Sequence, residues 1–150
     1  MPVIEVETEI NADIKTCFDL ARDVDFYKKS IKNTNEIPVD GKMVGLVEKG
    51  DYITWETTHL NFTQHLTLKV TEFKEPFLFV DEMVKGKFKS YKHEHIFKNH
   101  QNKTLMIDRF YFESANGIFG KIIDVLFLKR HMKKLLIERN IKLKAKAETL

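Results

Sequence analysis

Residues 36 to 114 form a run of short extended segments, and this run constrains the fold more than any other feature of the chain. Turn-forming residues separate the segments at 40–45, 50–51, 60–61, 74–76, 85–87 and 99–102. Each link is too short for the crossover that joins parallel strands, so neighbouring segments must pair antiparallel. The pattern predicts a meander of antiparallel strands through the middle of the chain.

The first of two hairpins that can be placed in register turns at residues 60–61. This turn sets Thr57 opposite Gln64 and Trp55 opposite Leu66. The reverse face is polar, so we expect the face that holds these four residues to point inward. It consists of Ile53, Trp55, Thr57, His59, Phe62, Gln64, Leu66, Leu68 and Val70.

The second hairpin turns within residues 99–102. The register that keeps Lys92, Glu94 and Lys98 in water predicts three facing inward pairs. These pairs are His95 with Met106, His93 with Asp108, and Tyr91 with Phe110. For residues 77–84 two turn lengths fit equally well, so the sequence leaves open whether Asp81 or Glu82 points inward.

Helices are predicted on both sides of the meander. Residues 2–10 alternate between apolar and polar, as in a strand, and Asn11 is the predicted N-cap of a short helix that follows. Asp23 is the predicted N-cap of a second short helix, which ends near residue 32. A long helix is predicted from Ile118 to about Ala147, and its first half is apolar almost all round. Such a helix is deeply buried or faces a cavity. Its inward stripe is Ile118, Ile122, Val125, Leu128, Met132 and Leu135.

Composition and charge exclude several classes of protein. Apolar residues make up 43% of the 150 residues and charged residues 31%, which predicts one globular domain over residues 1–150. The segment from Lys129 to Lys146 holds eight basic residues and one acidic residue, so the rest of the chain is acidic overall. This argues against a nucleic-acid partner but permits contact of that segment with an anionic membrane surface.

A cytoplasmic location is expected, because the first residues form a strand pattern without a signal sequence and Cys17, the single cysteine, cannot form an internal disulfide. The sequence does not distinguish a monomer from a homodimer. It contains no glycine-rich phosphate loop and no nucleophile signature, so we expect no cofactor.

The segment Phe79-Val80-Asp81-Glu82-Met83, then Gly86-x-Phe88, then Tyr91-x-His93-x-His95-x-Phe97 resembles a bacterial subgroup of the SRPBCC superfamily. That superfamily includes START-type lipid-binding domains, pollen-allergen-like proteins and polyketide cyclases. The resemblance implies an α+β helix-grip fold, in which a curved antiparallel sheet wraps around a long C-terminal helix and two short helices follow the first strand. It also implies a cavity for an apolar molecule between the sheet and that helix.

The inward positions and the resemblance together predict that the protein binds a lipid, a polyketide or an aromatic compound, as a carrier or sensor. Polar residues on an otherwise apolar inward face must be paired with each other, with water or with a ligand. The predicted ligand-binding residues are Trp55, Thr57, His59, Gln64, Leu66, Tyr91, His93, His95, Met106, Asp108, Phe110, Ile122 and Val125.

Three other interpretations of these residues stay open. His93 and Asp108 are candidates for acid–base catalysis of a cyclase or dehydratase type, or they form a structural pair that fixes the register. His93 and His95, with His59 and Asp108, have the residue types of a metal site, but no glutamate follows the second histidine, and we expect no metal. A lipid-transfer protein that docks on membranes is the third.

Overall fold

The computed structural model describes residues 3–31, 35–59, 62–114 and 121–150, and the side chains of His59, Phe62, Ser114 and residues 121–127 lie outside the described set. The described residues form seven strands and three helices. In chain order these are β1 (Val3–Ile10), α1 (Ile14–Ala21), α2 (Val24–Ser30), β2 (Glu36–Gly41), β3 (Tyr52–His59), β4 (Phe62–Lys74), β5 (Leu78–Lys85), β6 (Phe88–His100), β7 (Lys103–Ser114) and α3 (Lys121–Ala147).

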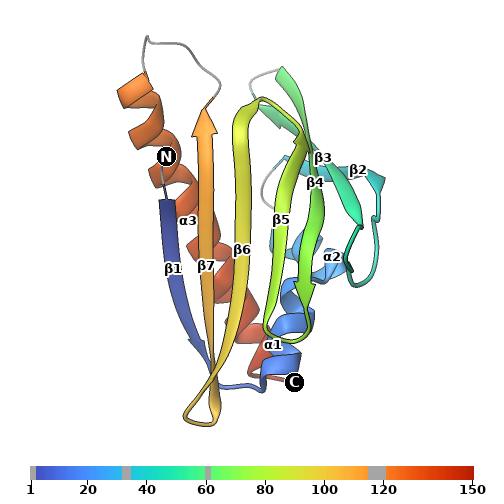
Figure 1. Cartoon of the computed structure of the whole chain (residues 1–150), viewed down its shortest axis with the longest axis vertical. Coiled ribbons are helices and arrows are strands. Elements are labelled where there is room, and N and C mark those ends of the chain that lie inside the picture. Colours follow the sequence, from blue (N-terminus) through green and yellow to red (C-terminus); the bar gives the residue numbers. More distant parts are fainter. Residues whose placement is uncertain (1–2, 32–34, 60–61, 115–120) are drawn as a thin grey trace.

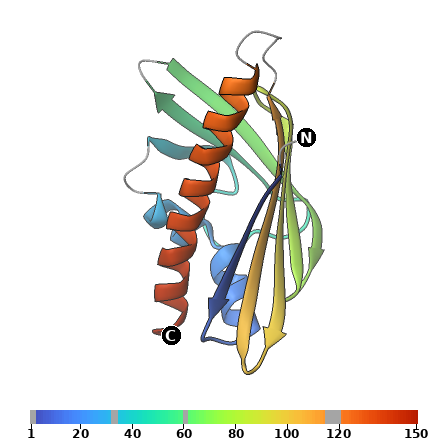
Figure 2. The same ribbon diagram turned by 90° about the vertical axis from the view of Figure 1, so that its left-hand side faces the viewer.

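The strands form one antiparallel sheet in the order β1-β7-β6-β5-β4-β3-β2 (Figure 1). The meander from β2 to β7 is as predicted, and β1 adds to the far edge by pairing with β7. Register shifts interrupt the pairing of β4 with β5 at two points, between Thr67 and Leu68 and between Val70 and Glu72. Such irregularities bend and twist a strand. The sheet curves accordingly, and α3 lies along its concave side (Figure 2).

The helices fill the concave side much as predicted, with one correction at a helix start. The N-cap of α1 is Asp13, whose carboxylate accepts a hydrogen bond from the Thr16 amide, and not Asn11. The backbone N–H of Asn11 instead donates to Glu148 near the C-terminus. Asp23 caps α2 as predicted. The predicted start of the long helix lies outside the described residues, and its end at Ala147 agrees with the prediction. No helix of the described residues has both the length and the apolar composition needed to cross a membrane.

The predicted register of the β6–β7 hairpin is wrong by two residues. His95 faces Asp108 and His93 faces Phe110, because His100 pairs with Lys103 around a two-residue turn. Both turn residues, Gln101 and Asn102, have positive φ angles. Two-residue hairpin turns of this left-handed kind match the twist of the strands. A shift of two residues keeps every side chain on its predicted face. In the β3–β4 hairpin the predicted register is confirmed.

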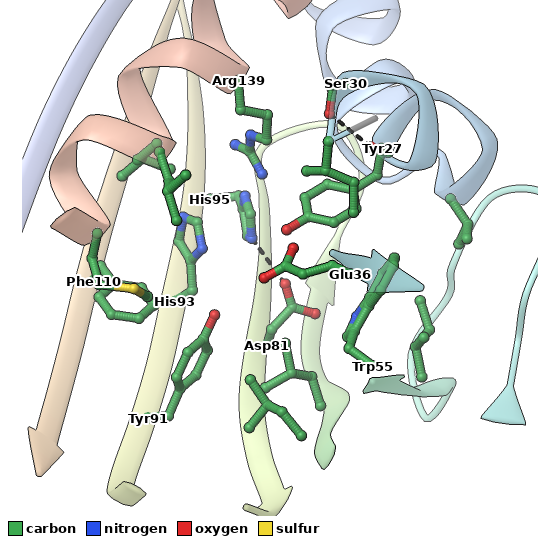
Figure 3. A pocket seen from close by; sticks show the side chains of 18 of the residues that line it. Tyr27, Ser30, Glu36, Trp55, Asp81, Tyr91, His93, His95, Phe110 and Arg139 are labelled. Atoms are coloured by element: carbon green, nitrogen blue, oxygen red, sulfur yellow. Dashed lines mark hydrogen bonds and ion pairs between the residues drawn. The ribbon is translucent and has the colours of Figure 1, made fainter. Parts of the chain in front are cut away.

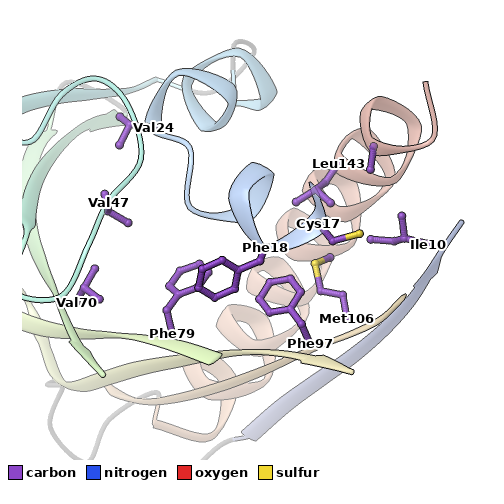
Figure 4. Close-up of a cluster of buried hydrophobic side chains, with 11 residues drawn as sticks. Ile10, Cys17, Phe18, Val24, Val47, Val70, Phe79, Phe97, Met106 and Leu143 are labelled. Atoms are coloured by element: carbon purple, nitrogen blue, oxygen red, sulfur yellow. The ribbon is translucent and has the colours of Figure 1, made fainter. Parts of the chain in front are cut away.

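Two clusters of buried side chains form the core, one toward each end of the sheet. In the first, Phe18 of α1 makes edge-to-face contacts with Phe79 and Phe97, with ring centroids 5.5 and 5.4 Å apart (Figure 4). Leu143 of α3 belongs to the same cluster. The second cluster joins β1 and β7 to Leu136 of α3. Members of both clusters line the cavity described next, so the cavity lies between them.

Candidate functional site

A cavity of about 390 Å³ lies between the concave face of the sheet and the helices α2 and α3. Strands β2 to β7 all contribute side chains to its wall. Most of the lining is aromatic or aliphatic, and a group of polar side chains gathers on one side (Figure 3). This size and lining are typical of sites for small organic molecules.

Most of the residues predicted to bind a ligand line this cavity. They are Trp55, Thr57, Gln64, Leu66, Tyr91, His93, His95 and Phe110. Met106 does not line it, because it is fully buried in the first core cluster. The side chains of His59, Ile122 and Val125 lie outside the described set.

The question left open between Asp81 and Glu82 is answered in favour of Asp81. Asp81 lines the cavity and bonds to His95, whereas Glu82 borders a separate shallow pocket together with Lys92. The two neighbours point to opposite faces because side chains alternate along a strand.

Asp108 lies behind the cavity wall, fully buried, where its carboxylate accepts three hydrogen bonds. His93 Nε2 and Arg139 Nη2 donate to Oδ1 at 2.7 and 3.2 Å, and Asn140 Nδ2 donates to Oδ2 at 2.7 Å. Burial alone would raise the pKa of Asp108, but the hydrogen bond from His93 and the charge of Arg139 outweigh burial and hold this pKa well below its ordinary value. Asp108 is therefore an anion that orients three side chains.

His95 sits between two carboxylates and two rings. Its Nε2 lies 2.9 Å from Asp81 Oδ2, and the imidazole stacks on Phe79 and on His93, with centroids 4.0 and 3.7 Å away. Burial, followed by the charge of His93, lowers the pKa of His95 well below its ordinary value, so the ring is neutral. Burial raises the pKa of Asp81 to about 6. A neutral ring that donates through Nε2 leaves Nδ1 as an acceptor, and this buried Nδ1 has no hydrogen-bond partner among the described residues.

The group of His93, His95 and Asp108 offers ligand atoms within 4.8 Å of one another, but it does not fit a metal ion. The two imidazoles are stacked 3.7 Å apart in roughly parallel planes, and because each ring's lone pairs lie in its own plane, they do not converge on one ion. The nearest oxygen of Asp108 also accepts from the Arg139 guanidinium, whose charge would repel a cation. These residues are arranged as a hydrogen-bond network.

Sequence reasoning missed several polar residues of the site, among them Tyr27, Glu36 and Arg139 in the cavity wall and Asn140, which bonds to Asp108. The spacing of Asn140 from the buried Leu136 and Leu143 is that of one helix face, and this signal was available in the sequence. Arg139 has the same kind of spacing, three residues after Leu136 and four before Leu143, but it stands in the basic run that suggested a solvated face. Tyr27 and Glu36 reach the wall from α2 and β2 (Figure 3).

No family model matches the chain, and no curated protein does. Solved structures do match it. The di-domain ARO/CYC StfQ from the steffimycin biosynthetic pathway superposes with a TM-score of 0.75 at 12% identity, over 98% of this chain and 50% of that one. The protein TTHA0849 from Thermus thermophilus gives 0.70 at 16% identity, over 97% and 99%. The major latex-like protein 151 from Panax ginseng gives 0.65 at 14%, over 97% of each chain. By its fold, therefore, the chain is a helix-grip protein, like these solved structures.

Proposed function

We propose that the protein binds a small, mostly apolar molecule in the cavity between the sheet and α3, as a carrier or sensor. The observation that carries this proposal is the cavity itself, which combines an apolar wall with one group of polar side chains. Among the described residues, the hydroxyls of Tyr27 and Tyr91 and the carboxylate of Glu36 form no hydrogen bond with another residue. These three residues are half-buried and line the cavity, so a ligand that pairs with them binds in a defined orientation.

Trp55 provides a direct test, because it is the chain's only tryptophan and lies in the cavity wall, 4.9 Å from the Tyr27 ring. Titration with the neutral fluorophore N-phenyl-1-naphthylamine should quench Trp55 emission in a saturable way with one site per chain. Mass spectrometry of the native protein should also show any small molecule that is retained through purification.

Thr57 and Thr58 give a matched pair of variants for this titration. They are adjacent on β3, but Thr57 lines the cavity and Thr58 is exposed on the reverse face. Thr57→Phe fills part of the cavity and should weaken probe binding at least tenfold, whereas Thr58→Phe should leave the affinity within about twofold. Equal effects of the two substitutions, or no saturable quenching of the parent protein, would refute the cavity as the binding site.

A second candidate function, acid–base catalysis on the bound molecule, is favoured by the hydrogen bond between His93 and Asp108. His93 lines the cavity, and its Nε2 donates to a carboxylate that stays ionised, which fixes the ring's orientation. If His93 moves a proton, the His93→Gln variant should no longer convert a polyketide-like substrate but should bind the neutral fluorophore with unchanged affinity. Loss of both together would indicate a structural role.

A further inference from the structure

Two carboxylates on the polar side of the cavity lack a basic partner. Glu36 at the start of β2 and Asp81 in β5 point into the same space, together with the hydroxyl ends of Tyr27 and Tyr91 (Figure 3). Among the described residues, the one ionic contact of Asp81 is with His95, which is neutral, and Glu36 has none. Neither carboxylate forms an ion pair with a lysine or arginine of the described part of the chain.

Arg139 is a cation in the wall of this space, but its guanidinium bonds to other residues than Glu36 and Asp81. Its guanidinium donates to Asp108 at 3.2 Å and to the amide oxygen of Asn140 at 3.1 and 3.3 Å. The Asp108 carboxylate is fully buried and ionised, and Arg139 pairs with it; the charges of His93 and Arg139 also act on Asp81, but neither residue forms an ion pair with Asp81. When Glu36 and Asp81 are ionised, the carboxylates of Glu36, Asp81 and Asp108 outnumber the single guanidinium around this part of the wall.

Aromatic rings surround the same two carboxylates. The Trp55 indole and the Tyr27 ring meet at an interplanar angle of 58°, and Tyr91 lies against Phe110 with its hydroxyl directed toward Asp81 and His93 (Figure 3). Ring faces attract cations, and the attraction grows when the cation is shielded from water. Two carboxylates next to three aromatic rings have the chemistry that recognises an organic cation.

We propose that the cavity selects an aromatic or aliphatic amine, whose ammonium group binds between Glu36 and Asp81 and whose apolar part lies against Trp55, Tyr27 and Tyr91. This inference rests on the proposed function and names the chemical class of its ligand. Burial raises the pKa of each carboxyl group, and a positive ligand between the two acts in the opposite direction by favouring their ionised forms.

Three probes of nearly equal size separate the amine inference from the more general proposal. These are 2-(1-naphthyl)ethylamine, which is a cation at pH 7.5, 2-(1-naphthyl)ethanol, which is neutral, and 1-naphthaleneacetate, which is an anion. Isothermal titration calorimetry at one salt concentration should give a dissociation constant for the amine at least tenfold below that of the alcohol. The anion should bind most weakly.

Variants then assign the preference to residues. Glu36→Gln and Asp81→Asn should each reduce the ratio of amine to alcohol affinity several-fold, because each removes a negative charge and keeps a hydrogen-bonding group at the same position. Asn at position 81 can still accept the hydrogen bond from His95, so this variant keeps that contact. Glu72→Gln removes the same charge from an exposed position of β4 and should leave the ratio unchanged.

Each outcome of the calorimetry is decisive. Equal binding of amine and alcohol, or tighter binding of the anion, overturns the amine inference and leaves the proposal of apolar ligand binding standing. Failure of all three probes to bind overturns both. A preference for the amine that survives both substitutions overturns the assignment to Glu36 and Asp81.

Discussion

Asp108 is the residue on which the polar part of the site depends. It is fully buried on β7, and its hydrogen bonds connect β6 to α3 through His93, Arg139 and Asn140. A buried charge is stable only when its partners are complete. The network therefore holds the long helix at a fixed position over the sheet, and it sets the direction in which His93 faces the cavity.

Removing the Asp108 carboxylate should destabilise the protein by about 3 to 5 kcal/mol, because Asp108→Ala leaves the Arg139 guanidinium buried without a counter-charge. Urea denaturation monitored by circular dichroism measures this loss. Arg139→Met in the Asp108→Ala background should restore part of the stability, since it removes the charge left without a partner. The exposed pair of Arg109 and Glu5 is the control, and Glu5→Ala should cost less than about 1 kcal/mol. A loss below 1 kcal/mol for Asp108→Ala would contradict the role given to this network.

At the scale of elements, α3 presents different faces to the core and to water. Leu136 is buried in the second core cluster, whereas Ile141, five residues later, is 62% exposed. Leu128 of the predicted inward stripe packs against the same cluster, and the side chain of Val125 lies outside the described set. The contact of Lys129–Lys146 with a membrane stays a prediction, and three of its basic residues, Arg139, Lys142 and Lys144, bond to atoms within the protein.

The same substitution at these two positions of α3 should have very different effects. Leu136→Asp places an unpaired carboxylate in an apolar cluster and should destabilise the protein by about 3 kcal/mol or more. Ile141→Asp should change the free energy of unfolding by less than about 1 kcal/mol. Thermal unfolding of both variants at pH 7 measures the difference. Similar midpoints would show that the helix does not pack on the sheet through this face.

The elements could be predicted from the sequence because each depends on local signals. Turn residues mark the strand ends, and the alternation of polar and apolar residues assigns the two faces of each strand. The solvent-facing and inward faces of β3, β4, β6 and β7 could therefore be predicted from the sequence pattern. The β6–β7 register did not follow, because residues 99–102 favour a turn at several positions and only the backbone shows that Gln101 and Asn102 take the left-handed conformation. The error left each face intact but shifted the cross-strand partners of His93 and His95 by two residues.

The candidate site was predictable only where it lies on the sheet. Positions on β3 and β6 follow from the alternation, but Tyr27, Glu36 and Arg139 reach the cavity from elements that are far apart in the sequence. Their meeting depends on how α2, β2 and α3 pack around the concave face, which no local pattern contains. The basic run that contains Arg139 predicted a solvated helix face, because most such runs are solvated. In the structure Arg139 instead points inward and donates a hydrogen bond to the buried carboxylate of Asp108.

At the scale of the whole molecule, the cavity makes folding stability depend on pH, because His95 acts in one direction and the carboxyl groups of Asp81 and Glu36 act in the other. The folded protein keeps His95 neutral, so the unfolded chain takes up the extra proton as the pH falls below about 6.5, and this lowers stability. Asp81, with a pKa of about 6 in the folded protein against an ordinary 3.8, takes up its proton first in the folded state. Its contribution is therefore fully present below pH 3.8 and is lost as the pH rises through about 6.

Because these contributions offset each other, the wild-type protein should keep a nearly constant free energy of unfolding between pH 6.5 and 4.5. Asp81→Asn removes one of the compensating groups and exposes more of the effect of His95, so the stability of this variant should fall over the same range by about 2 kcal/mol more than that of the wild type. Below pH 4 both proteins should lose stability together, since the folded state holds the pKa of Asp108 well below its ordinary value and the unfolded state takes up that proton.

Urea titrations at half-unit pH intervals measure these curves, with the exposed-site variant Glu72→Gln expected to follow the wild type. If the Asp81→Asn curve runs parallel to the wild-type curve from pH 7 to 4.5, Asp81 does not take up a proton within the folded cavity, and the protonation assigned to this wall is wrong.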